Sequence, residues 1–356
     1  MKRPVAYLMI AVIGCAPRES AVEWLEQPML TPQASGTEAN FIAVRPVDAN
    51  VVWASGSRGT WARTLDGGLT WQTGIVEGAD SLQFRDVHPF SDRVAYVLSI
   101  GSGDQSRIYR TSDGGATWEL QFTNDEPAGF FDCFDFWDAN SGIAFSDSHD
   151  GSFQLITTRD GRTWSRIPTD RLPPATEGEG AFASSGTCVV AAADSVAWVG
   201  TGASDGAARV LRTTDRGRTW TIAQTSIARG PSAGITTLAF RDATHGSAIG
   251  GDIGRADTVS GHVALTSDGG LTWSPATPTP FNGAAYGSAW VPGAPRPTLV
   301  AVGPGGIAWS TDLARSWMPI DTLNHWAVAF AAPDAGWAVG PRGRITRIAL
   351  FVPAAS

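Results

Sequence analysis

Three acidic side chains are placed where their chemistry could matter: Asp147, Glu179 and Asp252. Each lies in a short segment rich in Gly and acidic residues, namely 147–151, 173–180 and 251–257. Two carboxylates on one pocket can act as general acid and as base or nucleophile in the hydrolysis of a glycosidic bond. Carboxylate oxygens are also the ligands that Ca²⁺ prefers. The alternative is a solvated acidic surface in which these carboxylates have no catalytic task.

Further polar residues in or beside these segments are candidates for a binding face. They are His149, Asp150, Glu177, Asp205, Asp257 and His262. None of the five His and three Cys residues has the spacing typical of a metal site. The sequence therefore predicts no metal and no cofactor, and Ca²⁺ is the one ion that the acidic segments could accommodate.

A repeat must position these segments, because one sequence pattern occurs six times. The copies are TLDGGLTW, TSDGGATW, TTRDGRTW, TTDRGRTW, TSDGGLTW and STDLARSW. They end at Trp71, Trp118, Trp164, Trp220, Trp273 and Trp317. Intervals of roughly 45 to 55 residues are typical of four-stranded propeller blades. The repeat predicts an all-β fold.

The Asp of each copy stands in a turn between the third and fourth strands of a blade. These residues are Asp66, Asp113, Asp215, Asp268 and Asp312, with Asp160 displaced by one position in the third copy. A short carboxylate accepts backbone N–H groups well in such a turn, and the Gly that follows supplies a positive φ. The following Trp is expected to pack between blades. We interpret these Asp residues as structural.

A seventh unit begins at Trp326 but lacks a Trp-led outer strand. Residues 21–30 resemble that missing strand, so we predict a seven-bladed propeller of four-stranded antiparallel blades. Its N-terminal strand would complete the last blade and remove the open edges. The propeller domain then covers 21–352, and a short tail covers 353–356.

The N-terminus has the pattern of an export signal. Two basic residues precede an apolar run that is too short to span a bilayer and ends in Gly14-Cys15. The run resembles a bacterial lipobox, so we expect a signal peptide over 1–14, lipidation of Cys15 and a tether over 15–20. Because Ala16 rather than Asp follows, this resemblance implies a periplasmic or cell-surface lipoprotein in the outer membrane of a diderm bacterium.

Cys133 and Cys188 form an even pair once Cys15 is set aside. Both open the first strand of a blade, and an exported protein meets an oxidising compartment. They are candidates for a disulfide, with two buried thiols as the alternative. The net charge of −8 disfavours a nucleic-acid partner, because phosphate binding needs a basic surface.

The repeats resemble the Asp-box, or BNR, repeats of sialidase-like propellers. Arg110 to Trp118 and the segment Gly336-Trp337-Ala338-Val339-Gly340 also resemble the Ycf48-like photosystem II stability and assembly factors. That resemblance implies a non-catalytic scaffold that binds an envelope or membrane protein complex. We expect a monomer that touches the membrane only through the lipid at its N-terminus. The alternative is an Asp-box glycoside hydrolase, rather than an oxidoreductase, acting on an extracellular glycan. The Phe-Arg-Ile-Pro segment of sialidases is absent.

Overall fold

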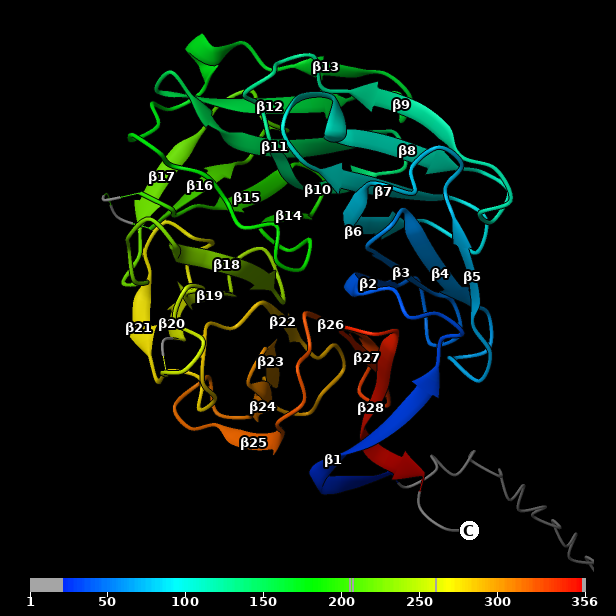
Figure 1. Cartoon of the computed structure of the whole chain (residues 1–356). Helices are drawn as coiled ribbons and strands as arrows, with labels where there is room; N and C mark the ends of the chain where they lie inside the picture. The colour runs from blue at the N-terminus through cyan, green and yellow to red at the C-terminus, as the bar shows by residue number, and fades with distance from the viewer. Residues whose placement is uncertain (1–21, 205, 207, 260, 354–356) are drawn as a thin grey trace, which may run out of the picture.

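The computed structural model describes residues 22–204, 206, 208–259 and 261–353, and within them the chain forms a ring of seven four-stranded sheets (Figure 1). Each sheet is antiparallel, and in six of the seven the strands follow sequence order from the centre of the ring outward. Alternating apolar residues make these strands two-sided, so that neighbouring sheets bury both faces between them. The predicted seven-bladed propeller is confirmed.

The first strand of each blade lines the central channel. In the order of the blades these are β2 (Phe41–Pro46), β6 (Gln83–Pro89), β10 (Phe131–Asp138), β14 (Val189–Ala192), β18 (Ala233–Phe240), β22 (Gly287–Trp290) and β26 (Ala327–Ala332). The second strands are β3 (Val52–Gly56), β7 (Ala95–Ile100), β11 (Ser141–His149), β15 (Val196–Gly200), β19 (Gly246–Asp252), β23 (Leu299–Gly303) and β27 (Ala335–Val339).

The third strands are β4 (Thr60–Thr64), β8 (Arg107–Thr111), β12 (Ser152–Thr158), β16 (Arg209–Thr213), β20 (His262–Thr266), β24 (Gly306–Ser310) and β28 (Arg344–Pro353). The outer strands of blades one to six are β5 (Gln72–Ile75), β9 (Glu119–Thr123), β13 (Trp164–Arg166), β17 (Thr221–Gln224), β21 (Ser274–Ala276) and β25 (Met318–Asp321). Two short 3-10 helices, η1 (Gly103–Gln105) and η2 (Thr169–Arg171), lie in connections.

The last blade takes its outer strand from the other end of the chain. Strand β1 (Val22–Ala34) pairs antiparallel with β28, with Leu30 opposite Ile348 and Ala34 opposite Arg344 (Figure 1). The sequence predicted this closure over 21–30, and the strand continues four residues further. Pairing β1 with β28 gives the seventh blade its fourth strand, so that it matches the other six.

The predicted turns share one hydrogen-bond pattern. In blade one the Thr70 amide donates to Asp66 Oδ1 over 2.9 Å, and the Thr70 hydroxyl donates to Oδ2 over 2.6 Å. These hydrogen bonds lower the pKa of Asp66 to about 2. In blade three Asp160 performs the same task one residue later, accepting from Thr163.

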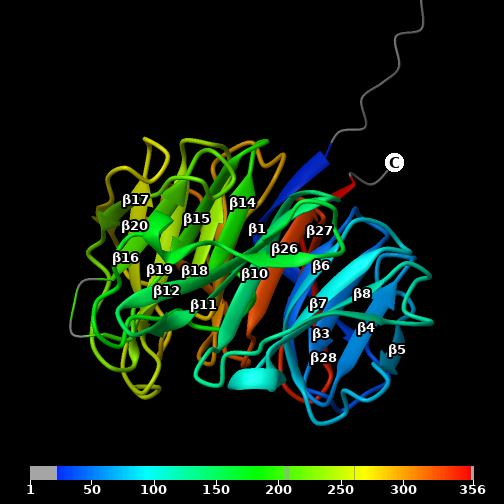
Figure 2. The same cartoon turned by 90° about the horizontal axis from the view of Figure 1, so that it is seen from above.

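The two faces of the ring carry different connections between strands, and Figure 2 shows the ring from a second side. The Asp turns donate backbone hydrogen bonds to the turns between first and second strands, as Gly67 does to Asn50. Both kinds of turn therefore lie on one face, here called the Asp-turn face. The connections between blades and between second and third strands lie on the opposite face, here called the loop-rich face. It carries the segments 147–151, 173–180 and 251–257.

Candidate functional site

The channel is closed near the loop-rich face by residues 180–187, here called the plug. This segment precedes β14 in blade four and is buried almost throughout. The Ala183 carbonyl accepts from Arg85 Nη1 of blade two over 3.0 Å, and the Ser185 hydroxyl donates to the Tyr286 carbonyl, just before blade six, over 2.7 Å. One segment thus joins three blades across the centre of the ring.

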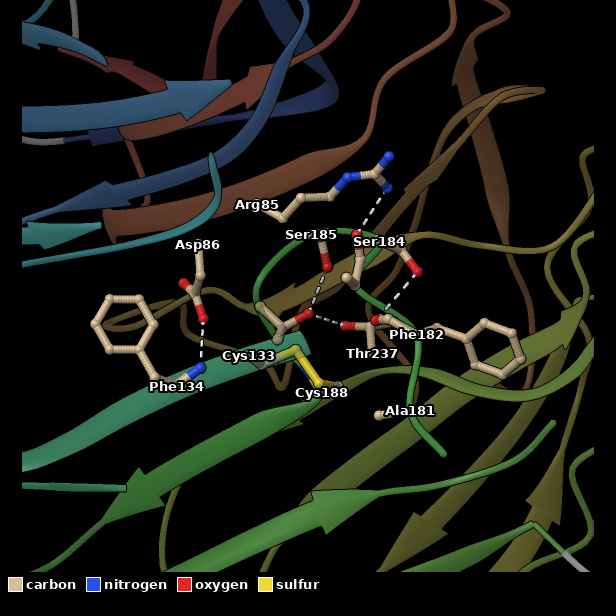
Figure 3. The surroundings of a disulfide bond; sticks show 12 residues. Arg85, Asp86, Cys133, Phe134, Ala181, Phe182, Ser184, Ser185, Cys188 and Thr237 are labelled. Atoms are coloured by element: carbon tan, nitrogen blue, oxygen red, sulfur yellow. Dashed lines mark hydrogen bonds between the residues drawn. A yellow bond between two sulfur atoms is a disulfide. The ribbon is translucent and has the colours of Figure 1, made fainter. Parts of the chain in front are cut away.

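A disulfide anchors the end of the plug. Cys133 of β10 is bonded to Cys188, and their Cα atoms are 5.9 Å apart (Figure 3). Neither residue has exposed surface. Hydroxyl groups continue the anchoring, because Thr187 contacts Ser185 over 2.6 Å and donates to Thr237 over 2.8 Å. The bridge therefore fixes the plug between blades three and four.

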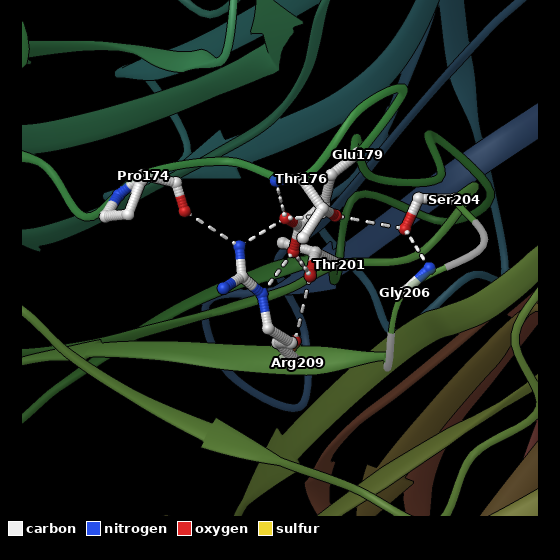
Figure 4. Close-up of polar contacts among 7 residues, drawn as sticks. All are labelled: Pro174, Thr176, Glu179, Thr201, Ser204, Gly206 and Arg209. Atoms are coloured by element: carbon white, nitrogen blue, oxygen red, sulfur yellow. Dashed lines mark hydrogen bonds and ion pairs between the residues drawn. The ribbon is translucent and has the colours of Figure 1, made fainter.

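Glu179 holds the start of the plug rather than facing a substrate. Its carboxylate pairs with the Arg209 guanidinium and accepts from the Thr201 hydroxyl over 2.6 Å (Figure 4). The Thr176 amide donates to its second oxygen over 2.9 Å. Burial opposes ionisation of Glu179, but the hydrogen bonds from Arg209, Thr176 and Thr201 outweigh it and lower the pKa. Both carboxylate oxygens of Glu179 therefore have partners within the chain.

Asp147 belongs to the same region and forms a carboxyl pair with Asp132. Its Oδ1 accepts from the Ala181 amide of the plug over 2.9 Å, and the Ser148 amide donates to the Glu179 carbonyl. Burial raises the pKa of both Asp132 and Asp147, and the neighbouring Asp147 raises that of Asp132 further. The pair therefore holds a proton more tightly than two exposed carboxyl groups would.

The third carboxylate, Asp252, is held in its own loop. Its Oδ1 accepts from the Ser232 hydroxyl over 2.6 Å and from the Gly254 amide over 2.9 Å. The segments around Asp147 and Glu179 therefore meet through hydrogen bonds, whereas Asp252 caps a turn in blade five. All three carboxylates have structural partners within the chain.

The remaining candidates divide into exposed residues and residues outside the described ranges. Exposed side chains on the loop-rich side are His149, Asp150, Glu177, Asp257 and His262. His149 Nε2 lies 3.3 Å from Asp150 Oδ2. Asp205 and Cys15 lie outside the described residues. Across the described part of the chain, no three His, Cys, Asp or Glu residues are grouped as a metal site would require.

A cluster that the sequence did not reveal lies at the channel mouth beside the plug. Arg85 stacks over the Trp326 ring at 5.2 Å, and the Tyr286 ring meets Trp326 edge to face at 5.6 Å. All three side chains are half-buried. Arg85 Nε and Trp326 Nε1 are buried, and no hydrogen-bond partner for either occurs among the described residues. We call these three residues the mouth cluster.

A β-bulge places Arg85 there. The pairing of β6 with β7 skips a residue between Phe84 and Asp86, and β10 skips the equivalent residue, Asp132. A bulge leaves its extra residue unpaired and re-aims its side chain. No residue type in the sequence announces this register change, so the mouth cluster could be found only in three dimensions. The plug was equally hidden, because small neutral residues carry no chemical signal.

No helix of the described residues has both the length and the apolar character that a membrane crossing requires.

Comparison with solved structures identifies relatives in fold. The chain is similar to a structure described as YCF48 bound to D1 peptide, with a TM-score of 0.63 and 16% identity over 92% of this chain and 99% of that chain. YCF48 from Cyanidioschyzon merolae gives a TM-score of 0.66 and 18% identity over 90% and 98%. The WD40 propeller domain of Doa1 gives 0.60 and 14% over 92% and 98%.

At these identities the likeness concerns the fold. No protein-family model and no curated protein matches the sequence. The resemblance to Ycf48-like propellers that the repeats suggested is therefore matched in three dimensions by a shared seven-bladed architecture.

Proposed function

We propose that this chain is a non-catalytic scaffold that binds a protein of the cell envelope through its loop-rich face, at the mouth cluster and the loops of blades three to five. The observation that carries the proposal is the mouth cluster itself, in which the half-buried Arg85 guanidinium stacks over the Trp326 ring and Tyr286 meets that ring edge to face. Arg, Trp and Tyr are the residue types that most often dominate protein interfaces.

The character of the surrounding surface supports a protein partner. Aromatic and Arg side chains held in a rigid frame are typical of residues that dominate protein interfaces. The plug keeps this part of the ring rigid, and the exposed side chains of Ile253 and Val259 add apolar area in blade five. The fold relative described as YCF48 bound to D1 peptide shows that a propeller of this architecture takes a peptide ligand.

Hydrolysis of a glycan is the weaker alternative, because the carboxylates proposed as catalytic already have partners within the chain. Glu179 is paired with Arg209, and Asp252 caps its own turn. Tyr286 and Asp132 both interact with Arg85, and burial raises the pKa of Tyr286. A phenolic nucleophile needs activation in the opposite direction. Asp147 likewise accepts from the Ala181 amide, so the three carboxylates are not arranged as the acid and nucleophile pair that the reaction requires.

Export and lipidation at Cys15 belong to the same proposal. They rest on the sequence pattern at the N-terminus and place the propeller in the periplasm or at the cell surface of a diderm bacterium, as a monomer on a lipid anchor. Radiolabelled palmitate incorporation into the full chain and into a Cys15→Ser variant tests this part alone. Equal labelling of both would refute the anchor and leave the binding proposal intact.

The binding proposal is tested by affinity capture from detergent-solubilised membranes of the native host, followed by mass spectrometry. We compare the full chain with Arg85→Gln, which removes part of the mouth cluster. The matched control is Arg241→Gln, because Arg241 stacks over Trp290 at 5.7 Å near the Asp-turn face. The proposal expects a stoichiometric partner that Arg85→Gln loses and Arg241→Gln keeps. Loss only in Arg241→Gln, or no partner for the folded parent, would overturn it.

A further inference from the structure

Below the plug, the channel contains a cavity of about 280 Å³ that opposes the proposed protein-binding face. Ser185, Gly186 and Thr187 of the plug line its inner end. Pro46, Phe240, Trp290 and Phe330 line it near the ends of first strands, on the Asp-turn side. The cavity is therefore a blind well, closed by the plug and directed toward the Asp-turn face.

The wall of the well combines apolar and polar groups. Its apolar residues include Val87, Val190, Leu238, Ala289, Val328 and Ala329. Its polar side chains include Asp86, Asp135 and Ser288. The lining comes from the first strands of all seven blades, which explains why no short sequence motif marks the site. Apolar walls with a few placed polar groups are the usual character of a small-molecule site. Its volume corresponds to about nine water molecules, enough for a single aromatic ring with a polar head.

Arg45 is the cationic side chain on this wall. It belongs to β2 in blade one, and its Nη1 donates to Asp135 Oδ1 of blade three over 2.7 Å. The guanidinium must therefore cross the inner face of blade two, within the channel. About a third of the Arg45 side chain remains exposed. Within the described residues, no acceptor contacts its Nε or Nη2, so these two nitrogens keep their donor capacity.

Two carboxyl groups, those of Asp135 and Asp86, lie close enough to Arg45 to interact with its charge, and their pKa values shift in opposite directions. Asp135 is ionised, because Arg45 and the adjacent His88 outweigh the effect of burial and lower its pKa. His88 Nδ1 lies 2.8 Å from Asp135 Oδ1, and burial with the nearby Arg45 charge lowers the pKa of His88 to about 4. Burial raises the pKa of Asp86, whose oxygens accept from the Val87 and Phe134 amides.

The well thus offers the Arg45 guanidinium, held at Nη1 by Asp135, beside aromatic and aliphatic side chains of the wall. We propose that it binds a small organic carboxylate with an aromatic or branched apolar body. The carboxylate accepts from Nε and Nη2 of Arg45, while Asp135 holds Nη1 and fixes the direction of the guanidinium. Two parallel N–H donors match the two oxygens of a carboxylate. The apolar body lies between Trp290, Phe330 and Leu238.

Fluorine NMR of 4-fluorobenzoate with the full chain tests this site, with 4-fluorobenzamide as the neutral probe of equal shape. We expect saturable binding of the acid, and binding of the amide about tenfold weaker because a charge-assisted hydrogen bond is replaced by a neutral one. Arg45→Gln should weaken binding of the acid about tenfold and bring the two probes close together. Arg93→Gln, an exposed Arg on the same face, is the matched control and should bind as the parent does.

A second variant guards against misfolding of Arg45→Gln, which loses its bond to Asp135. Ala289→Phe keeps Arg45 and places a ring on the half-buried wall, so it should exclude both probes while the unfolding transition stays cooperative. The proposal is overturned if the folded parent binds no acid, if acid and amide bind equally, or if folded Ala289→Phe binds as the parent does. Each result is independent of protein capture at the opposite face.

Discussion

The two faces of the ring use the same acidic residue types for different purposes. On the Asp-turn face each Asp caps a turn of one repeated geometry, as Asp66 and Asp113 do with equal donor distances. On the loop-rich face no two loops are alike, and Asp147, Glu179 and Asp252 each bond a different structure. The repeated turns therefore belong to the structural frame of the propeller. The plug, the mouth cluster and the proposed interface lie where the chain departs from the repeat.

The first test of this contrast removes the disulfide that fixes the plug. Cys133→Ala with Cys188→Ala should lower the free energy of unfolding by about 4 kcal/mol, because the bridge closes a loop of 55 residues. Urea denaturation of the double variant and the oxidised parent measures the difference. Equal stability of the double variant and the parent would show that the bridge does not hold this region.

A second variant breaks the buried ion pair at the start of the plug. Glu179→Gln leaves the Arg209 charge without its counter-ion, so unfolding should become easier by about 3 kcal/mol at neutral pH. The carboxylate contributes this stability above its unfolded pKa and loses it as the pH falls, since its folded pKa is lowered. Glu177→Gln, in the same loop but exposed, should change stability by less than about 0.5 kcal/mol.

On the Asp-turn face, stability should be sensitive to substitution where a turn packs against the neighbouring blade. A Cβ at Gly115 would lie 2.6 Å from the Trp61 ring, at a φ of +89°. Gly115→Ala should therefore cost about 2 kcal/mol through overpacking and backbone strain. Gly78→Ala has a φ of +72° and no atom within 4 Å of the added Cβ, so it measures the backbone cost alone. If both variants lose a similar amount of unfolding free energy, contact with Trp61 adds nothing to the backbone cost, and tight packing at the turn is contradicted.

The smallest effect concerns the carboxyl pair under the loop-rich face. Because burial raises the folded pKa of Asp132, its proton favours folding at low pH and this contribution fades as the pH rises above about 4. Asn imitates the protonated form. Asp132→Asn should thus be more stable than the parent at pH 8, by about 1 kcal/mol, and the advantage should vanish near pH 4.

Urea midpoints across this pH range decide whether Asp132 is responsible. Asp150→Asn, an exposed neighbour, should follow the parent curve. If Asp132→Asn also follows the parent curve, the carboxyl pair carries no shared proton.

The repeats predicted the fold because they are local. The six repeats and the further unit that begins at Trp326 predicted seven blades, and the residues resembling an outer strand located the closure that β1 makes with β28. The residue types also identified the three carboxylates as candidates. They could not predict that Arg209 would form an ion pair with Glu179. That partnership is set by the packing of blade four.

The mouth cluster and the well were beyond sequence reasoning for a related reason. Arg85, Tyr286 and Trp326 are more than 200 residues apart at their extremes, and the bulge that turns Arg85 has no sequence signature. The well takes its wall from seven strands and its floor from a segment of small residues. Such sites arise from closure of the ring, which joins residues that no local pattern relates.

The most direct test of the central claim is site-specific photo-crosslinking in the native host. A benzoylphenylalanine is placed at Glu177 or Asp257 on the loop-rich face, and at Leu69 or Leu271 on the Asp-turn face, all of which are exposed. The account predicts one crosslinked protein partner from the loop-rich positions and none from the Asp-turn positions. Crosslinks confined to Leu69 and Leu271 would contradict it.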